Sequence, residues 1–155
     1  MQTDFIPGIL GACDFFKGLD PNQIADIAPI CRPCRFDTGD TIYRQGGLGE
    51  EIFIIADGQV LLERAVSVGP RKGTVPVAFL GKGKIIGAWS TLLSEPHMLM
   101  LSAVCQRPAL LLAIRGVDLR ERMTQDIALG FRILEKLCLL LRDRVQVTLG
   151  ALDNL

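Results

Sequence analysis

Residues 51–64 read EIFIIADGQVLLER, two apolar runs on either side of Asp57-Gly58. Each run has the length of a β-strand, which predicts strands at 51–56 and 59–64. An Asp-Gly pair between two such runs favours a tight turn, because type I′ turns need positive φ at both central residues. The segment therefore predicts a β-hairpin.

The same pattern of short apolar runs separated by glycine extends over residues 35–115. Further strands are predicted at 41–44, 74–80, 98–104 and 109–115. The stretch 67–73 contains two glycines and a proline and is predicted to be a looser, solvated hairpin tip. Many short strands with glycine turns are typical of an antiparallel sandwich or barrel.

Helical periodicity flanks this β region. Before residue 35, Asp20 is a predicted N-cap, with Pro21 at the first helical position. After Gly116, apolar residues recur at alternating steps of four and three, a spacing typical of a coiled coil. This seam consists of Ile127, Phe131, Leu134, Cys138, Leu141, Val145, Thr148 and Leu152.

The terminal helix is predicted to cover 126–152, with a length of about 40 Å. A second apolar stripe on it consists of Leu129, Ile133, Leu137 and Leu140. One stripe can pack on the β region while the seam meets a second copy, which predicts a homodimer through this helix. The alternative is a helix buried entirely in its own chain.

Length and composition point to one folded domain. The chain has 155 residues, of which 49% are hydrophobic and 22% charged, enough for a full core and unlike a disordered chain. We expect a single domain over 1–155, with N-terminal helices in 1–34, the β region in 35–115 and C-terminal helices in 116–155.

Charge and hydropathy argue against several kinds of partner. Seventeen Lys and Arg balance 17 Asp and Glu, so no bulk positive field attracts nucleic acid or an anionic membrane. No apolar run approaches the ~18 residues that cross a bilayer. Asp4 stands where a signal peptide would carry positive charge, and Pro7 and Gly8 interrupt the apolar stretch. We expect a cytoplasmic protein without membrane contact.

The five cysteines are an odd number, which argues against a disulfide framework and for reduced thiols. Cys31 and Cys34 have the spacing of a redox or metal pair. A zinc site would need a second close pair, and the single histidine, His97, is far along the chain. We expect the cysteine pair to be structural.

Four motifs occur in order along the chain: 36–46 (FDTGDTIYRQG), 53–60 (FIIADGQV), 79–87 (FLGKGKIIG) and 144–148 (RVQVT). Together they resemble the cyclic-nucleotide-binding domain of the catabolite activator and fumarate–nitrate regulator family. The resemblance implies a mainly β fold with flanking helices: a double-stranded, jelly-roll-like β-roll followed by a long C-terminal dimerisation helix.

The resemblance places a phosphate-binding segment at Gly87. In the family a short helix opened by Gly-Glu offers N–H groups to the cyclic phosphate, the Glu holds a ribose hydroxyl, and an Arg neutralises the phosphate. Here Ala88 stands at the Glu position, and His97, nearest to the Arg position, is followed by Met98. Ala88 cannot accept a ribose hydrogen bond, and neutral His97 lacks the fork of a guanidinium. Tight binding of a cyclic nucleotide is not expected.

A residual anion site is still conceivable, because a helix N-terminus after Gly87 can cradle an anion together with Ser90 and Thr91. Thr148 resembles the dimer-helix residue that meets the purine, and it equally fits a core seam position. The candidate ligand-binding residues are Gly87, Ala88, Trp89, Ser90, Thr91, His97, Met98 and Thr148. The ligand itself is unknown: a cyclic nucleotide would bind weakly.

No motif of a catalytic site occurs, so we expect no enzyme. We predict a dimeric sensor or regulatory module with a degenerate phosphate-binding cassette, which either binds a different ligand or is a structural dimerisation unit. The pattern is also compatible with the effector domain of a longer transcription regulator. Nothing after Leu155 could form a helix-turn-helix, so this chain alone is not expected to bind nucleic acid.

The alternative is a haem or iron–sulfur gas or redox sensor on the same fold. Its ligands would be His97 with Met98 or Met100, or the cysteines. The cysteines considered are Cys13, Cys31, Cys34 and Cys105. Met and Cys are more often core residues than ligands, and these spacings match no known cluster motif, which makes the alternative the weaker one.

Overall fold

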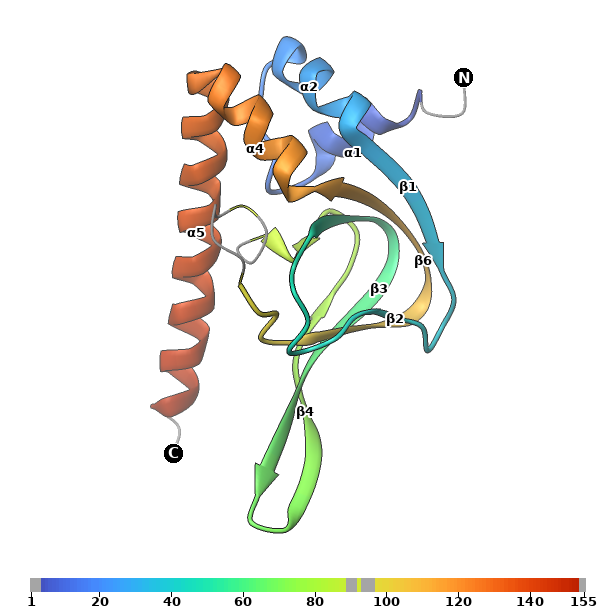
Figure 1. Ribbon diagram of the computed structural model, residues 1–155, viewed down its shortest axis with the longest axis vertical. Coiled ribbons are helices and arrows are strands. Elements are labelled where there is room, and N and C mark those ends of the chain that lie inside the picture. The colour runs from blue at the N-terminus through green and yellow to red at the C-terminus, as the bar shows by residue number, and fades with distance from the viewer. Residues whose placement is uncertain (1–3, 89–91, 93–96, 154–155) are drawn as a thin grey trace.

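The computed structural model describes residues 4–88, 92 and 97–153 (Figure 1). Helices α1 (Ile6–Ala12) and α2 (Pro21–Ile27) and the 3-10 turn η1 (Ala28–Ile30) precede the sheet. Its strands are β1 (Cys31–Phe36), β2 (Thr41–Tyr43), β3 (Glu51–Val68), β4 (Arg71–Leu80), β5 (Ile85–Ile86) and β6 (Ser102–Arg115). Helices α4 (Gly116–Gln125) and α5 (Ile127–Leu152) follow. The predicted fold class is confirmed.

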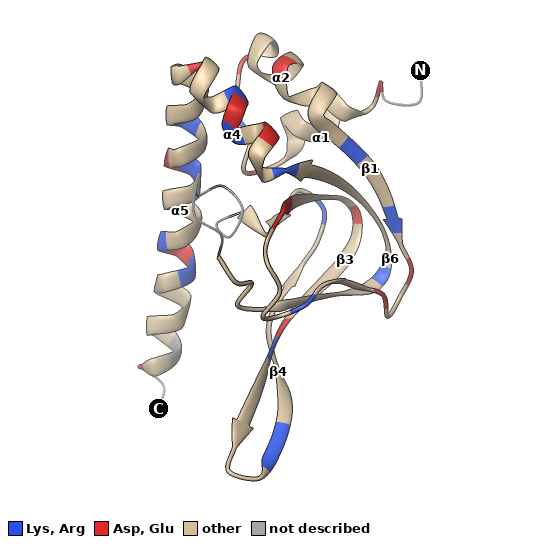
Figure 2. Ribbon diagram, viewed as in Figure 1, with Lys and Arg blue, Asp and Glu red and all other residues tan. Residues whose placement is uncertain are grey.

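All strand pairs are antiparallel, in the order β1-β6-β3-β4, with β2 also paired to β6 and β5 to β3. The sheet curls on itself, α1, α2 and α4 gather at one end, and α5 runs alongside (Figure 1). Strands β3 and β4 project from the other end as a two-stranded arm. Figure 2 shows Lys and Arg scattered over the strands and helices, and the last turns of α5 without charge.

Two apolar clusters stabilise the fold, one on each face of the central strands. The cluster between sheet and helices, here called the helix-side core, includes Ile52 and Ile54. The cluster enclosed by the curled sheet, here called the inner core, includes Phe53 and Ile55. Because successive side chains of a strand point to opposite faces, a continuous apolar run is needed where both faces are buried.

The hairpin predicted at Asp57-Gly58 is wrong, because β3 continues through this pair as one strand. Strand β6 is likewise continuous where the sequence predicts two strands. The pairing register of β3 and β6 shifts on both sides of Asp57, and Gly58 has a φ of 99°. The glycine therefore forms a bulge in a long strand instead of reversing the chain.

The boundary predicted between helices and strands is also displaced. Helices are predicted through residue 34, yet the chain is extended from Cys31 onward as β1. This strand lies at the end of the sheet order, and an edge tolerates Pro33 because one N–H group fewer is needed there. The β region consequently begins at residue 31.

Three local predictions are confirmed. Asp20 caps α2, accepting a hydrogen bond of 2.8 Å from the Gln23 N–H. The chain reverses between Val68 and Arg71, so the tip of the β3–β4 arm lies inside the predicted stretch 67–73. The long terminal helix is α5, which starts one residue after its cap, Asp126.

The two stripes of α5 have different surroundings. Leu129, Ile133 and Leu137 are buried in the helix-side core, and Leu141 is half-buried against it. The other seam residues are exposed: Ile127, Phe131, Leu134, Cys138, Val145, Thr148 and Leu152. A helix buried entirely within its own chain is therefore excluded. No described helix is long and apolar enough to cross a membrane.

Candidate functional site

Strand β5 leads into the segment that the sequence assigns to phosphate binding. Gly87 follows it with a φ of 81°, which L side chains rarely adopt. A Cβ on Gly87 would stand 2.8 Å from the Glu51 carbonyl oxygen. The backbone therefore requires glycine at 87 whether or not a ligand binds.

We expect Gly87→Ala to lower the free energy of unfolding by roughly 2–4 kcal/mol, because backbone strain and the contact with the Glu51 oxygen add. The control is Gly39→Ala, since Gly39 has a φ of 91° but no atom within 4 Å of its missing Cβ. Urea unfolding of both variants measures the difference. Equal losses would mean that the approach to Glu51 is unimportant.

Ala88, the residue after Gly87, has a buried side chain. Its side chain is buried in the helix-side core, as is that of Leu92, and both residues have helical backbone. Position 88 therefore offers a ligand no polar side chain. A glutamate here would place a carboxylate among apolar groups, which is strongly unfavourable without a partner. The candidates Trp89, Ser90 and Thr91 lie outside the described residues.

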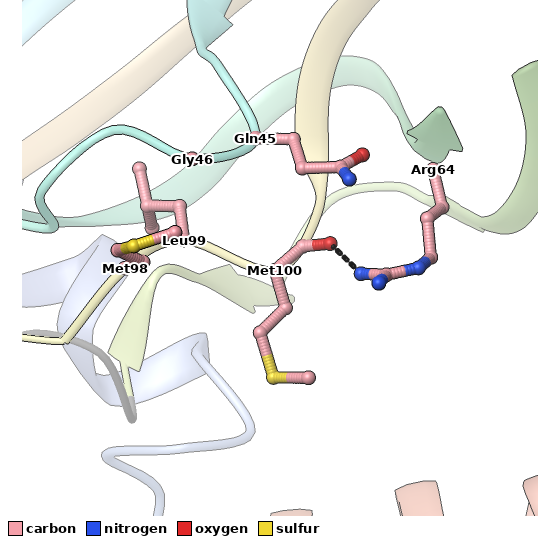
Figure 3. A pocket seen from close by; sticks show the side chains of 6 residues that line it. All are labelled: Gln45, Gly46, Arg64, Met98, Leu99 and Met100. Carbon is pink, nitrogen blue, oxygen red and sulfur yellow. Dashed lines mark hydrogen bonds between the residues drawn. The ribbon is translucent and has the colours of Figure 1, made fainter. Parts of the chain in front are cut away.

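His97 and Met98 lie on the exposed segment that leads to β6. Met98 forms an isolated bridge with Leu48 and is 63% exposed. Only Met98 of the two lines the open pocket of about 270 Å³ in Figure 3. The pocket is lined by Gln45, Gly46, Arg64, Met98, Leu99 and Met100.

Arg64 in this pocket is a residue that the sequence analysis missed. Its Nη1 donates a hydrogen bond of 2.7 Å to the Met100 carbonyl oxygen (Figure 3). The signal was present in β3, where Val60 and Leu62 are buried in the inner core and Arg64 follows in the same alternation. A charged residue after a buried apolar row indicates where the strand leaves the core: beyond Glu63, β3 pairs only with β4, and Arg64 is exposed there.

Tyr43 connects the surroundings of Gly87 with α5. Its Cε2 would lie 3.8 Å from a Cβ on Gly87, and its ring stacks on Phe53 with centroids 6.4 Å apart. Burial raises the pKa of Tyr43 to about 12, against the opposing effect of the positive charge of Arg144. The Thr148 hydroxyl donates to the Arg144 carbonyl oxygen at 2.9 Å. Thr148 thus uses its hydroxyl within α5, on an exposed face.

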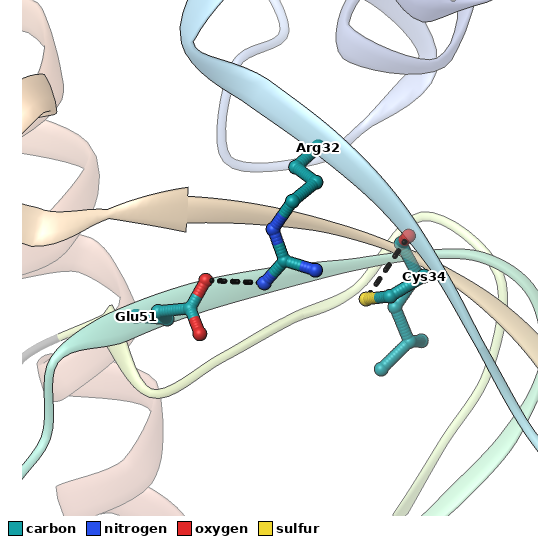
Figure 4. Close-up of polar contacts among 4 residues, drawn as sticks. Arg32, Cys34 and Glu51 are labelled. Atoms are coloured by element: carbon teal, nitrogen blue, oxygen red, sulfur yellow. Dashed lines mark hydrogen bonds and ion pairs between the residues drawn. The ribbon is translucent and has the colours of Figure 1, made fainter.

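Cys31 and Cys34 point to opposite faces of β1. The Cys31 thiol donates to the Ile27 carbonyl oxygen at the helix-side core, and the Cys34 thiol donates to the Leu111 oxygen at 3.6 Å at the inner core (Figure 4). Burial raises the pKa of Cys31 to about 12 and also raises that of Cys34. Two thiols on opposite faces of a strand cannot share one metal ion, which supports a structural role.

The cysteines considered as cluster ligands are divided between the two cores. Cys13 belongs to the helix-side core and Cys105 to the inner core. His97, Met98 and Met100 are exposed. Within the described part of the chain, no three His, Cys, Asp or Glu side chains are placed to hold a metal ion.

Comparison with known proteins finds a family model and several relatives that match this chain. Residues 33–126 match the family model described as cyclic nucleotide-binding domain. The acetyltransferase Pat of Mycolicibacterium smegmatis is 30% identical over 89 residues, 57% of this chain and 25% of that protein. The CRP-like cAMP-activated global transcriptional regulator of Mycobacterium tuberculosis is 31% identical over 61 residues, 39% of this chain and 27% of that protein. The chain thus spans about a quarter of these relatives.

A solved structure supports the same relationship. The catabolite activator protein of Thermus thermophilus superposes with a TM-score of 0.71 and 29% sequence identity. The match covers 90% of this chain and 61% of that one. At 90% of this chain, the structural match is longer than the region 33–126 covered by the family model.

Proposed function

The chain belongs to the family of cyclic nucleotide-binding domains, and we propose that it is a dimeric sensor module whose phosphate-binding segment no longer holds cyclic AMP tightly. Family membership and the similarity to a transcriptional regulator support a regulatory rather than a catalytic role. We further propose that it acts in the cytoplasm and binds no membrane and, by itself, no nucleic acid.

The observation that carries this proposal is the burial of Ala88. In the family's arrangement the residue after the glycine holds the ribose, whereas here its methyl group packs in the helix-side core. The positive charge expected some ten residues later is replaced by His97 and the apolar Met98. Loss of both charge-assisted contacts weakens nucleotide binding by roughly 10²–10⁴-fold.

We expect cyclic AMP at about 0.1 mM to raise the melting temperature little or not at all, because stabilisation equals RT ln(1 + [L]/Kd) and vanishes when Kd exceeds the ligand concentration. Scanning fluorimetry with and without the nucleotide measures the shift, and titration calorimetry measures the affinity. Low-micromolar binding would contradict the proposal and indicate ordinary second-messenger sensing.

Native mass spectrometry of the purified protein tests the sensor role more broadly, because it reads copy number and retained small molecules together. A dimer with a bound organic ligand would support the proposal. A coloured protein that retains haem or iron–sulfur would favour the alternative sensor instead. A gene product that continues past Leu155 into a basic helix-turn-helix would make this module the effector domain of a transcription regulator.

A further inference from the structure

The pocket beside Met98 has a single ionisable side chain in its wall. Arg64 comes from β3, and Met98, Leu99 and Met100 come from the segment before β6. Gln45 and Gly46 close the remaining side. The pocket therefore combines one guanidinium with a mostly apolar, sulfur-rich surface (Figure 3).

Most of the hydrogen-bonding capacity of Arg64 is unused within the described residues. A guanidinium has five N–H donors, and the hydrogen bond to the Met100 carbonyl oxygen uses one of them. None of the ion pairs found among the described residues includes Arg64. Beyond Glu63, β3 pairs only with β4, so Arg64 is exposed at the base of the arm and its guanidinium borders the pocket.

Gln45, the other polar side chain of the pocket, already has partners. The Gln45 Oε1 accepts a hydrogen bond of 2.7 Å from the Ala65 N–H, and its Nε2 donates to the Ala65 oxygen at 3.5 Å. The Gly46 N–H donates to the Leu99 oxygen at 2.8 Å. Recognition by polar contact in this pocket consequently falls to Arg64.

We propose that Arg64 binds the charged group of the ligand in this chain, and that the pocket takes an organic monoanion whose apolar body rests on Met98 and Met100. This rests on the proposed function and names the ligand class of that sensor. The guanidinium fork matches phosphodiester and carboxylate oxygens alike, and methionines adapt to irregular apolar shapes. Arg64 thus supplies, from β3, the guanidinium that position 97 lacks.

The pocket predicts weak discrimination among ligands of this class. No free polar side chain in its described wall could read the edge of a base, so cyclic AMP and cyclic GMP are expected to bind alike. The two possible sources of the anion are a nucleotide phosphodiester and an aliphatic carboxylate. Titration with cyclic AMP in one arm and octanoate in the other, each up to about 5 mM, distinguishes them.

The test compares the wild-type protein with Arg64→Gln, Arg64→Lys and a control, Arg71→Gln, at an exposed position near the arm tip. Arg64→Gln is expected to weaken binding of the monoanion about tenfold or more, Arg64→Lys about threefold, and Arg71→Gln not at all. Adenosine, which has no charge, should bind the wild type and Arg64→Gln equally. A purely structural role of the Arg64–Met100 bond would instead affect neutral and charged compounds together.

Two results would overturn the assignment. One is equal affinity of wild type and Arg64→Gln for cyclic AMP or octanoate. The protein would then still bind the anion, but at a site other than Arg64, and the sensor function would be unaffected. The other is failure of the wild type to bind cyclic AMP, cyclic GMP and octanoate. If native mass spectrometry then also finds no retained small molecule, the sensor function fails together with the assignment.

Discussion

Leu134→Asp combined with Val145→Asp is expected to convert the protein from dimers into monomers at tens of micromolar. Both residues belong to the exposed seam of α5, with 43% and 55% of their surface accessible. An unpaired carboxylate buried in an interface costs about 3 kcal/mol or more, and a symmetric dimer would contain four. Leu141 is unsuitable for this test because it is half-buried against the helix-side core.

The matched control is Leu139→Asp with Gln146→Asp on the same helix. Both positions are exposed and lie off the seam, so the control introduces two aspartates into α5 without placing them in the proposed interface. Sedimentation should find dimers for the wild type and the control and monomers for the seam variant. A wild-type protein that sediments as a monomer at tens of micromolar would contradict the dimer proposal.

Gly58→Ala is expected to be the most damaging single-methyl substitution in the β region. A Cβ at this position would stand 2.6 Å from both the Pro108 carbonyl oxygen and the Ala109 Cα. Those atoms are backbone of the central strand β6 and cannot withdraw without breaking its pairing. This overlap and the strain of a positive φ for alanine add. We therefore expect the substitution to lower the free energy of unfolding by at least about 3 kcal/mol.

Gly46→Ala provides the comparison for this substitution. Gly46 also has a positive φ, of 86°, but no atom lies within 4 Å of its missing Cβ. Its alanine variant should lose only the strain, about 1–2 kcal/mol. Thermal unfolding of both variants measures the difference in their stability. A Gly58→Ala protein as stable as Gly46→Ala would contradict the prediction, because it would mean that the backbone of β6 moves aside at little cost.

Two residues of the candidate site are fixed by the fold and not by a ligand. Gly87 is held by the approach to Glu51, and Ala88 by packing in the helix-side core. These requirements are structural and survive without a nucleotide. Arg64, Met98 and Met100 border the open pocket instead, and the proposal assigns ligand binding to them.

Local pattern in the sequence determined the type and order of most elements. The steps of four and three predicted α5 with its two stripes, and Asp20-Pro21 predicted the start of α2. Glycine-punctuated apolar runs predicted the antiparallel sheet. These predictions succeed because helix and strand periodicity and capping depend on residues a few positions apart.

Only the tertiary structure decided which conformation and which surroundings each local sequence pattern has in the folded protein. Asp57-Gly58 is a bulge because β6 continues past it, and Cys31 and Cys34 are separated because β1 has a core on each face. The pocket joins Gln45, Arg64 and Met98, which no short-range pattern connects. The physical reason is the same in each case: turn type, side-chain face and pocket lining depend on contacts between residues distant in sequence, which local spacing does not encode.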